Sequence, residues 1–77
     1  MIQIRVRLAT INDVKQFVHL VNRYPFDIDL VSGRYVVDAK SIMGIFSLDL
    51  SQPILVKVHS DEAEELLSAL EVYRSED

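Results

Sequence analysis

Two histidines and a few hydroxyl side chains are the first residues of this 77-residue chain to consider for nucleophilic or acid–base chemistry. An imidazole can act as a nucleophile or exchange a proton, so His19 and His59 are the first candidates. His19 lies off the apolar stripe of a predicted helix, and His59 ends a predicted strand. Their separation gives no metal-ligand spacing, and the chain has no cysteine to complete a zinc site. We therefore expect no catalytic residue, no metal and no cofactor.

Thr10 and Ser41 are hydroxyl residues that each precede a predicted helix. Residues of this type commonly cap the first amides of a helix, and Asn12 and Asp38 are alternative caps at the two places. A serine at a helix start can also be a site of covalent modification, and the two roles are compatible. The residue types alone leave both roles open for Ser41.

The first half of the chain predicts a strand, a helix and a hairpin. Residues 2–8 alternate apolar and polar side chains, as in a strand with one buried face. A helical stripe follows, and Pro25 ends that helix. Residues 26–30 alternate again, and Ser32-Gly33 predicts a tight turn into a third strand at residues 34–37. The helical stripe consists of Val14, Phe17, Val18 and Val21.

The second half predicts a short helix after Ser41, a fourth strand over residues 54–58 and a last helix. Ser60 or Asp61 is expected to cap the last helix, because Glu64 stands at the capping-box spacing from Asp61. The apolar stripe of that helix consists of Ala63, Leu66, Leu67, Leu70 and Tyr73. Periodicity alone allows either an open-faced antiparallel sheet or a ferredoxin-like two-layer sandwich.

Length and composition predict one domain over residues 1–77, since 49% of the residues are hydrophobic. No apolar run is long enough to cross a bilayer and no signal-like segment opens the chain, so we expect a cytoplasmic protein without membrane contact. Residues 61–77 carry seven acidic side chains and one basic one. This acidic end argues against nucleic-acid binding through the last helix.

Residues 38–48 contain the string Lys-Ser-Ile-Met-Gly-x-x-Ser-Leu, whose apolar members follow no simple strand or helix period. The string resembles the serine-bearing segment of HPr, the small phosphocarrier of the bacterial sugar phosphotransferase system, and of its regulatory relative Crh. The resemblance implies an α+β fold, an open-faced β-sandwich with a four-stranded antiparallel sheet and helices on one face. It decides between the two architectures that periodicity leaves open.

The phosphate-accepting site of that family is missing from this sequence. In HPr the first helix begins with a Gly-Leu-His-x-Arg-Pro-Ala type of motif, whose histidine accepts phosphate from Enzyme I. Placing residues 16–18 on the family's Gln-Phe-Val leaves Thr10 at the histidine position. Asn12 and Asp13 then stand at the arginine and the proline, and a carboxylate there repels a phosphoryl group. The resemblance therefore implies a relative that does not carry phosphohistidine.

Ser41 matches the serine that HPr kinase/phosphorylase modifies in low-GC Gram-positive bacteria, where the product is corepressor for the catabolite control repressor. By this resemblance, the kinase and the repressor are the expected partners. The family also uses neighbouring apolar residues as an exposed patch for partner proteins, and burial of these residues is the alternative. The corresponding partner-binding patch consists of Lys40, Ile42, Met43 and Phe46, with Lys40 also a charge partner for phosphate on Ser41.

Three functions remain open. The first is a regulatory or scaffolding protein that acts through Ser41 and the partner-binding patch, as a monomer or weak dimer. The second is a degenerate binding module whose partner is unrelated to sugar transport and in which Ser41 only caps a helix. The third is a phosphocarrier that uses His19 or Thr10, which the rewritten segment from Thr10 to Lys15 opposes.

Overall fold

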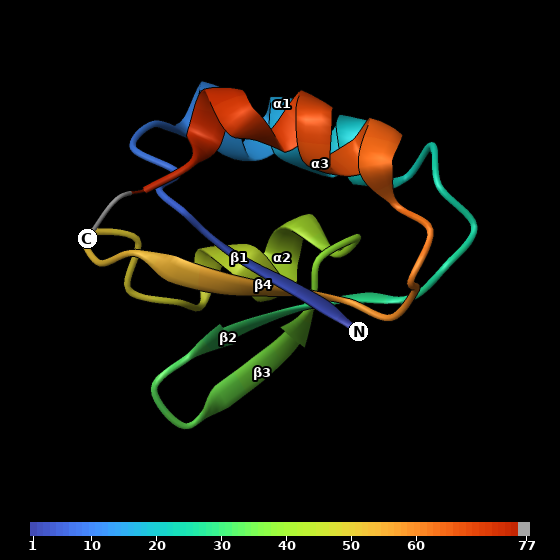
Figure 1. The fold of residues 1–77 in the computed structure, drawn as a ribbon. Helices are drawn as coiled ribbons and strands as arrows, with labels where there is room; N and C mark the ends of the chain where they lie inside the picture. Colours follow the sequence, from blue (N-terminus) through green and yellow to red (C-terminus); the bar gives the residue numbers. More distant parts are fainter. Residues whose placement is uncertain (76–77) are drawn as a thin grey trace.

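Four strands form one antiparallel sheet in the order β1-β4-β2-β3 in the computed structural model, which describes residues 1–75. The sheet is covered by helices on one face (Figure 1). The predicted α+β open-faced sandwich is therefore confirmed. The elements in chain order are β1 (Ile2–Val6), α1 (Ile11–Val21), β2 (Ile28–Ser32), β3 (Tyr35–Asp38), α2 (Ile42–Phe46), β4 (Ile54–Val58), α3 (Glu64–Leu70) and the 3-10 turn η1 (Glu71–Tyr73).

The register of the sheet places apolar side chains under the helices. Ile4, Val56, Leu30 and Val37 stand opposite one another across the four strands. Neighbouring positions in each strand point to the other face, which remains open. These strand residues and the predicted helical stripes contribute to the core. Most of them are buried, and those that are half-buried are Ile4, Val18, Val37, Leu67 and Tyr73.

The β2–β3 hairpin has the two-residue loop Gly33-Arg34, because Ser32 pairs directly with Tyr35. Gly33 has a φ of 59°, whereas Arg34 has no positive φ. Glycine in this first loop position is the signature of a type II′ turn, whose twist matches the flanking strands. The predicted tight turn is present, but Arg34 belongs to the loop and Phe26 precedes β2.

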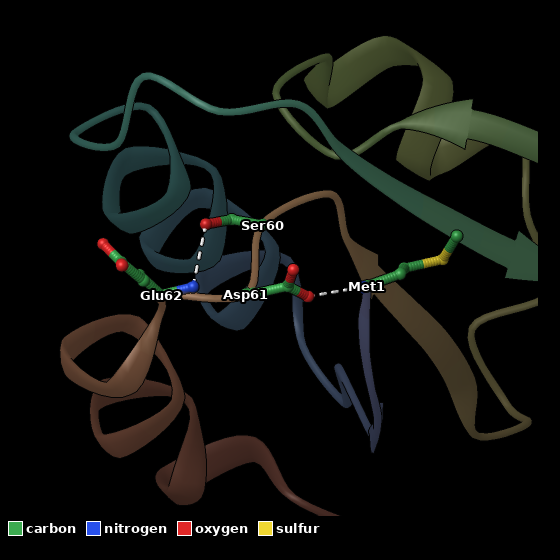
Figure 2. A network of polar contacts seen from close by, with 4 residues as sticks. All are labelled: Met1, Ser60, Asp61 and Glu62. Carbon is green, nitrogen blue, oxygen red and sulfur yellow. Dashed lines mark hydrogen bonds and ion pairs between the residues drawn. The ribbon is translucent and has the colours of Figure 1, made fainter.

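The start of α3 differs from the prediction, since neither Ser60 nor Asp61 caps this helix. Ala63 is the N-cap residue, and it makes no side-chain cap bond. Figure 2 shows the reason: Asp61 Oδ1 accepts a hydrogen bond of 2.9 Å from the Met1 amino group. Ser60 Oγ instead accepts from the Glu62 N–H at 3.1 Å, within the turn before the helix. Both candidate caps therefore have other hydrogen-bond partners: Met1 for Asp61, and Glu62 for Ser60.

The segment after η1 returns to the outer edge of β1, which the sequence did not predict. The Arg7 N–H donates to the Tyr73 carbonyl at 2.8 Å, and the Ser75 N–H donates to the Arg5 carbonyl at 2.9 Å. Val6 and Arg74 form an antiparallel bridge between these two bonds. This segment therefore covers the C-terminal half of the β1 edge. Among residues 1–75, the structure has no helix that is both long and apolar enough to span a bilayer.

Candidate functional site

Ser41 is the N-cap of α2, as its position before the helix suggested. Its backbone is extended, and its Oγ accepts a hydrogen bond from the Gly44 N–H at 3.2 Å. The residue is exposed. Gly44 allows α2 to lie close to β3, because a Cβ at this position would stand 3.3 Å from the Val37 Cβ. The hydroxyl of Ser41 is thus ordered by the helix and open to solvent.

The partner-binding patch divides into an outward and an inward part. Met43 is 77% exposed and Phe46 is 41% exposed, so both present apolar surface to solvent. Ile42 is half-buried and packs against the core, while Ile45 is fully buried. In a helix, residues three apart lie on the same side, so Ile42 and Ile45 share the side that faces the core. Met43 and Phe46 are therefore the exposed apolar residues of α2.

Lys40 is half-buried and directed towards the end of α1. Its Nζ donates to the Tyr24 carbonyl at 2.7 Å, in the loop that follows the helix. Asn22 Nδ2 donates to the Val18 carbonyl at 2.8 Å and to the Lys40 carbonyl at 3.5 Å. These bonds tie the entry to α2 to the end of α1. The ammonium that the sequence suggested as a phosphate partner is thus held by a backbone carbonyl.

Thr10 is the N-cap of α1 and forms a capping box with Asp13. Thr10 Oγ1 accepts from the Asp13 N–H at 3.0 Å, and Asp13 Oδ2 accepts from the Thr10 N–H at 3.3 Å. The Ala9 N–H donates to the same carboxylate oxygen at 3.2 Å. The chain's own carboxylate therefore occupies the start of the helix. The negative charge of this carboxylate stands at the positive end of the helix dipole, where it opposes the binding of an external anion.

The charge of Asp13 also reaches Tyr73, at the other end of the chain. Burial, and secondarily the Asp13 carboxylate, raise the pKa of the Tyr73 phenol above its ordinary value of 10.0. The Tyr73 ring meets Phe17 of α1 edge-on, with ring centroids 6.1 Å apart. The first turns of α1 thus carry the Asp13 carboxylate and pack against the Tyr73 ring.

The two histidines lie on separate elements and are not joined to Thr10 or Ser41. His19 is exposed in the last turn of α1. His59 follows β4, and its Nε2 is 2.8 Å from Asp29 Oδ2. A hollow of about 300 Å³ adjoins this pair, and its lining consists of Asp27, Ile28, Asp29, Asp38 and His59. Within residues 1–75, no group of histidine and carboxylate side chains has the arrangement of a metal site.

Sequence reasoning missed several exposed apolar residues outside the patch. Ile11 stands at the first position of α1, next to Thr10, and is exposed. Tyr35 and Val36 are exposed on β3, the outer strand of the sheet. The sequence predicts β3 as a strand from the apolar run that follows the tight turn. Only the strand order, however, identifies which strand is at the edge.

Comparisons with known proteins identify a matching family and similar solved structures. The family profile PTS-HPr, described as the PTS HPr component phosphorylation site, matches residues 11–75. A search of curated proteins found no match.

Two solved structures are similar over most of the chain. The crystal structure of HPr-C-His from Thermoanaerobacter tengcongensis has a TM-score of 0.77 at 27% identity, and the match covers 91% of this chain and 86% of that one. The phosphocarrier protein HPr from Bacillus anthracis str. Ames has a TM-score of 0.72 at 32% identity, with 96% of each chain covered.

Proposed function

Because this chain belongs to the PTS HPr family, we propose that it is a regulatory or scaffolding protein of the bacterial sugar phosphotransferase and carbon-regulation system that does not carry phosphohistidine. The observation that carries this proposal is the capping box of α1. Thr10 stands at the position that the resemblance assigns to the histidine, and the Asp13 carboxylate accepts the amides beside it. A cytoplasmic location belongs to the same proposal.

Three physical requirements of phosphoryl transfer are unmet at this place. An imidazole nucleophile is missing, because a threonine hydroxyl replaces it and is bonded to the Asp13 N–H. The cation that would balance the phosphate charge is replaced by the neutral Asn12. A carboxylate adds repulsion at the helix start. The family match begins at residue 11, so the stretch that ends in Thr10 lies outside it.

Partner binding remains well supported, because family members work through contacts with other proteins of the system. Met43 offers an adaptable thioether and Phe46 a rigid aromatic ring, a combination that suits recognition of a protein surface. The exposed Ser41 hydroxyl begins the same helix. A phosphate on Ser41, added by HPr kinase/phosphorylase, would place about two negative charges beside this apolar surface. Such a change alters which partner the surface accepts, a catabolite control repressor among them.

The first experiment is phosphoryl transfer from labelled phosphoenolpyruvate through Enzyme I, with a histidine-bearing HPr as positive control. We expect no acid-labile phosphate on this protein, since it lacks the nucleophile and its charge partner. Stoichiometric label on His19, His59 or Thr10 would sink this part of the proposal.

The second experiment tests the surface of α2. Met43→Asp and Phe46→Asp should each weaken binding to a partner isolated from the native cell at least tenfold, with the melting temperature little changed. Val72→Asp is the matched control, because Val72 is 79% exposed on η1 and lies outside α2. Equal weakening by all three variants, or unfolding by the α2 variants alone, would contradict a binding role for this surface.

A second function, a binding module with a partner unrelated to sugar transport, is favoured by the capping geometry of Ser41. The Ser41 hydroxyl already has a structural task in its bond to the Gly44 N–H. Incubation with HPr kinase and ATP separates the two functions. One acid-stable phosphate that Ser41→Ala abolishes supports the regulatory function. A folded protein that the kinase leaves unmodified supports the unrelated module.

A further inference from the structure

The two edges of the sheet differ in how far other parts of the chain cover them. The edge of β1 is covered at its C-terminal half by the segment around Arg74. β3 forms the opposite edge, and among residues 1–75 it pairs only with β2 (Figure 1). Exposed strand edges invite pairing with another strand, and proteins usually protect them with prolines, bulges or lysines. β3 contains no proline or lysine, and its register with β2 is continuous.

Alternation along β3 identifies the backbone groups that face outward. The Ala39 N–H donates to the Ile28 carbonyl at 2.9 Å, so the odd-numbered residues of this stretch turn their backbone groups towards β2. The two-residue loop agrees, because its flanking pair, Ser32 and Tyr35, is a hydrogen-bonded pair in such hairpins. It follows that the N–H and C=O of Val36 point to the free edge. The Val36 side chain itself is 63% exposed.

The strand is complementary to itself in one antiparallel register. If Val36 stands opposite Val36 of a second copy, Arg34 faces Asp38 of that copy, and Asp38 faces its Arg34. Tyr35, which is 67% exposed, then stands opposite Val37 of the second copy. Opposite charges and aromatic–β-branched pairs both stabilise cross-strand neighbours. A shift of the register by two residues would separate the charged pairs.

The charged residues at the ends of β3 are accessible for this pairing. Arg34 and Asp38 are both exposed. Arg34 has no side-chain partner among the described residues. Asp38 Oδ1 accepts from the Lys40 N–H at 2.9 Å, which fixes the carboxylate next to the strand end.

We propose that β3 pairs antiparallel with β3 of a second copy of this chain, centred on Val36, and joins the two sheets into one. The contact is isologous, because the same strand serves both partners around a two-fold axis. It uses strand addition, in which backbone hydrogen bonds supply affinity and side chains select the partner. Four residues on each side form a small interface, so the dimer is weak and reversible.

Charge reversal provides the decisive experiment, with sedimentation velocity over a wide concentration range as the measurement. The wild-type protein should shift from monomer to dimer as its concentration rises. Arg34→Glu and Asp38→Lys should each remain monomeric, because either change places like charges opposite each other twice. An equimolar mixture of the two variants should form the dimer again, because every charged pair between them is then opposite in sign.

A backbone variant makes the test independent of the charges. Val36→Pro removes an N–H that faces the free edge and leaves the bonds to β2 in place, and proline is tolerated at such edge positions. This variant should keep its fold and lose the dimer, whereas Val36→Thr should keep both. Three results would overturn the proposal: a wild-type protein that is monomeric at every concentration, a mixture of charge variants that stays monomeric, or a dimer that Val36→Pro does not weaken.

Discussion

The first turn of α1 depends on two side chains that serve each other. Thr10 accepts the Asp13 N–H, and Asp13 accepts the Thr10 N–H, so two otherwise unpaired amides are satisfied. The same carboxylate adds a negative charge at the helix start, which opposes an external anion there. The structural role of this pair and the proposed loss of phosphate binding thus rest on one arrangement, so no single substitution is expected to create a phosphocarrier.

We predict that Thr10→Ala lowers the free energy of unfolding by about 1 kcal/mol, the usual cost of removing an N-cap hydroxyl. Urea unfolding at neutral pH is the measurement. Thr10→Ser is the matched control and should change the stability by much less, because it keeps the accepting oxygen. Equal losses in both variants would mean that the methyl group, and not the cap bond, is important here.

Asp61 allows a prediction of pH dependence. The hydrogen bond from the Met1 amino group, and secondarily its charge, lower the pKa of the Asp61 carboxyl below its ordinary value of 3.8. A lowered pKa in the folded state contributes stability above pH 3.8, and this contribution is lost as the pH falls through the folded pKa. Wild type should therefore exceed Asp61→Asn in stability near neutral pH.

The difference between these two proteins should disappear in acid, when Asp61 is protonated. Urea midpoints measured from neutral pH down to about pH 2 follow this change, which lies below the unperturbed range of aspartate. Glu62→Gln is the control, because it removes the charge of a neighbouring exposed residue whose backbone N–H makes the hydrogen bond to Ser60. A difference that is constant over the whole range would show that Asp61 acts without its charge.

Among the elements, those with a local period were predictable from the sequence. The alternation in β4 and the stripe of α1 repeat over several residues, so each predicts both the element and its buried face. The start of α3 was not predictable, because the partner of Asp61 lies 60 residues away. The contact of Arg74 with β1 was not predictable either, because a pairing of two or three residues is too short to show a period in the sequence.

The candidate site was predictable to a similar extent. The sequence placed Ser41 at a helix start, as the structure has it. The absence of a histidine at the position of Thr10 stays a prediction that rests on the family resemblance. The sequence did not distinguish the half-buried Ile42 from the exposed Met43, because a helix of five residues is too short to show which side is buried. Nor did it give the direction of Lys40, which depends on a carbonyl in another loop.

The hairpin is the element whose geometry is most demanding. Gly33→Ala should destabilise the protein by about 1–2 kcal/mol, because an L-residue is strained at the φ of 59° that the loop requires. Space is not the cause, since a Cβ at Gly33 would meet no atom within 4 Å. Arg34→Ala is the control in the same loop and should change thermal unfolding little. An unaltered Gly33→Ala variant would show that the loop relaxes to another turn.

On the scale of the whole molecule, the proposed dimer interface on β3 lies next to α2, which carries the proposed partner surface. α2 rests close to β3, with Gly44 next to Val37. A two-fold axis perpendicular to the sheet keeps the helix-covered faces of both copies on the same side. Two copies of the Met43 and Phe46 surface would then be presented together, and a partner with two sites would bind them with higher avidity.

The cover on the β1 edge and the free β3 edge lead to a last prediction, which rests on the proposed pairing of β3. Removal of the chain from Arg74 onward takes away the Val6 bridge and the bond from Ser75 to the Arg5 carbonyl, and it exposes the edge of β1. A molecule with one fully free edge closes into a dimer, whereas a molecule with two fully free edges can add further copies at both sides. Sedimentation of the truncated protein should therefore reveal species larger than a dimer at concentrations where the full chain forms dimers only. Val36→Pro in the truncated protein should limit assembly again, because only the β1 edge then remains. A truncated protein that stays folded and assembles no further than the full chain would show that the segment around Arg74 does not protect this edge.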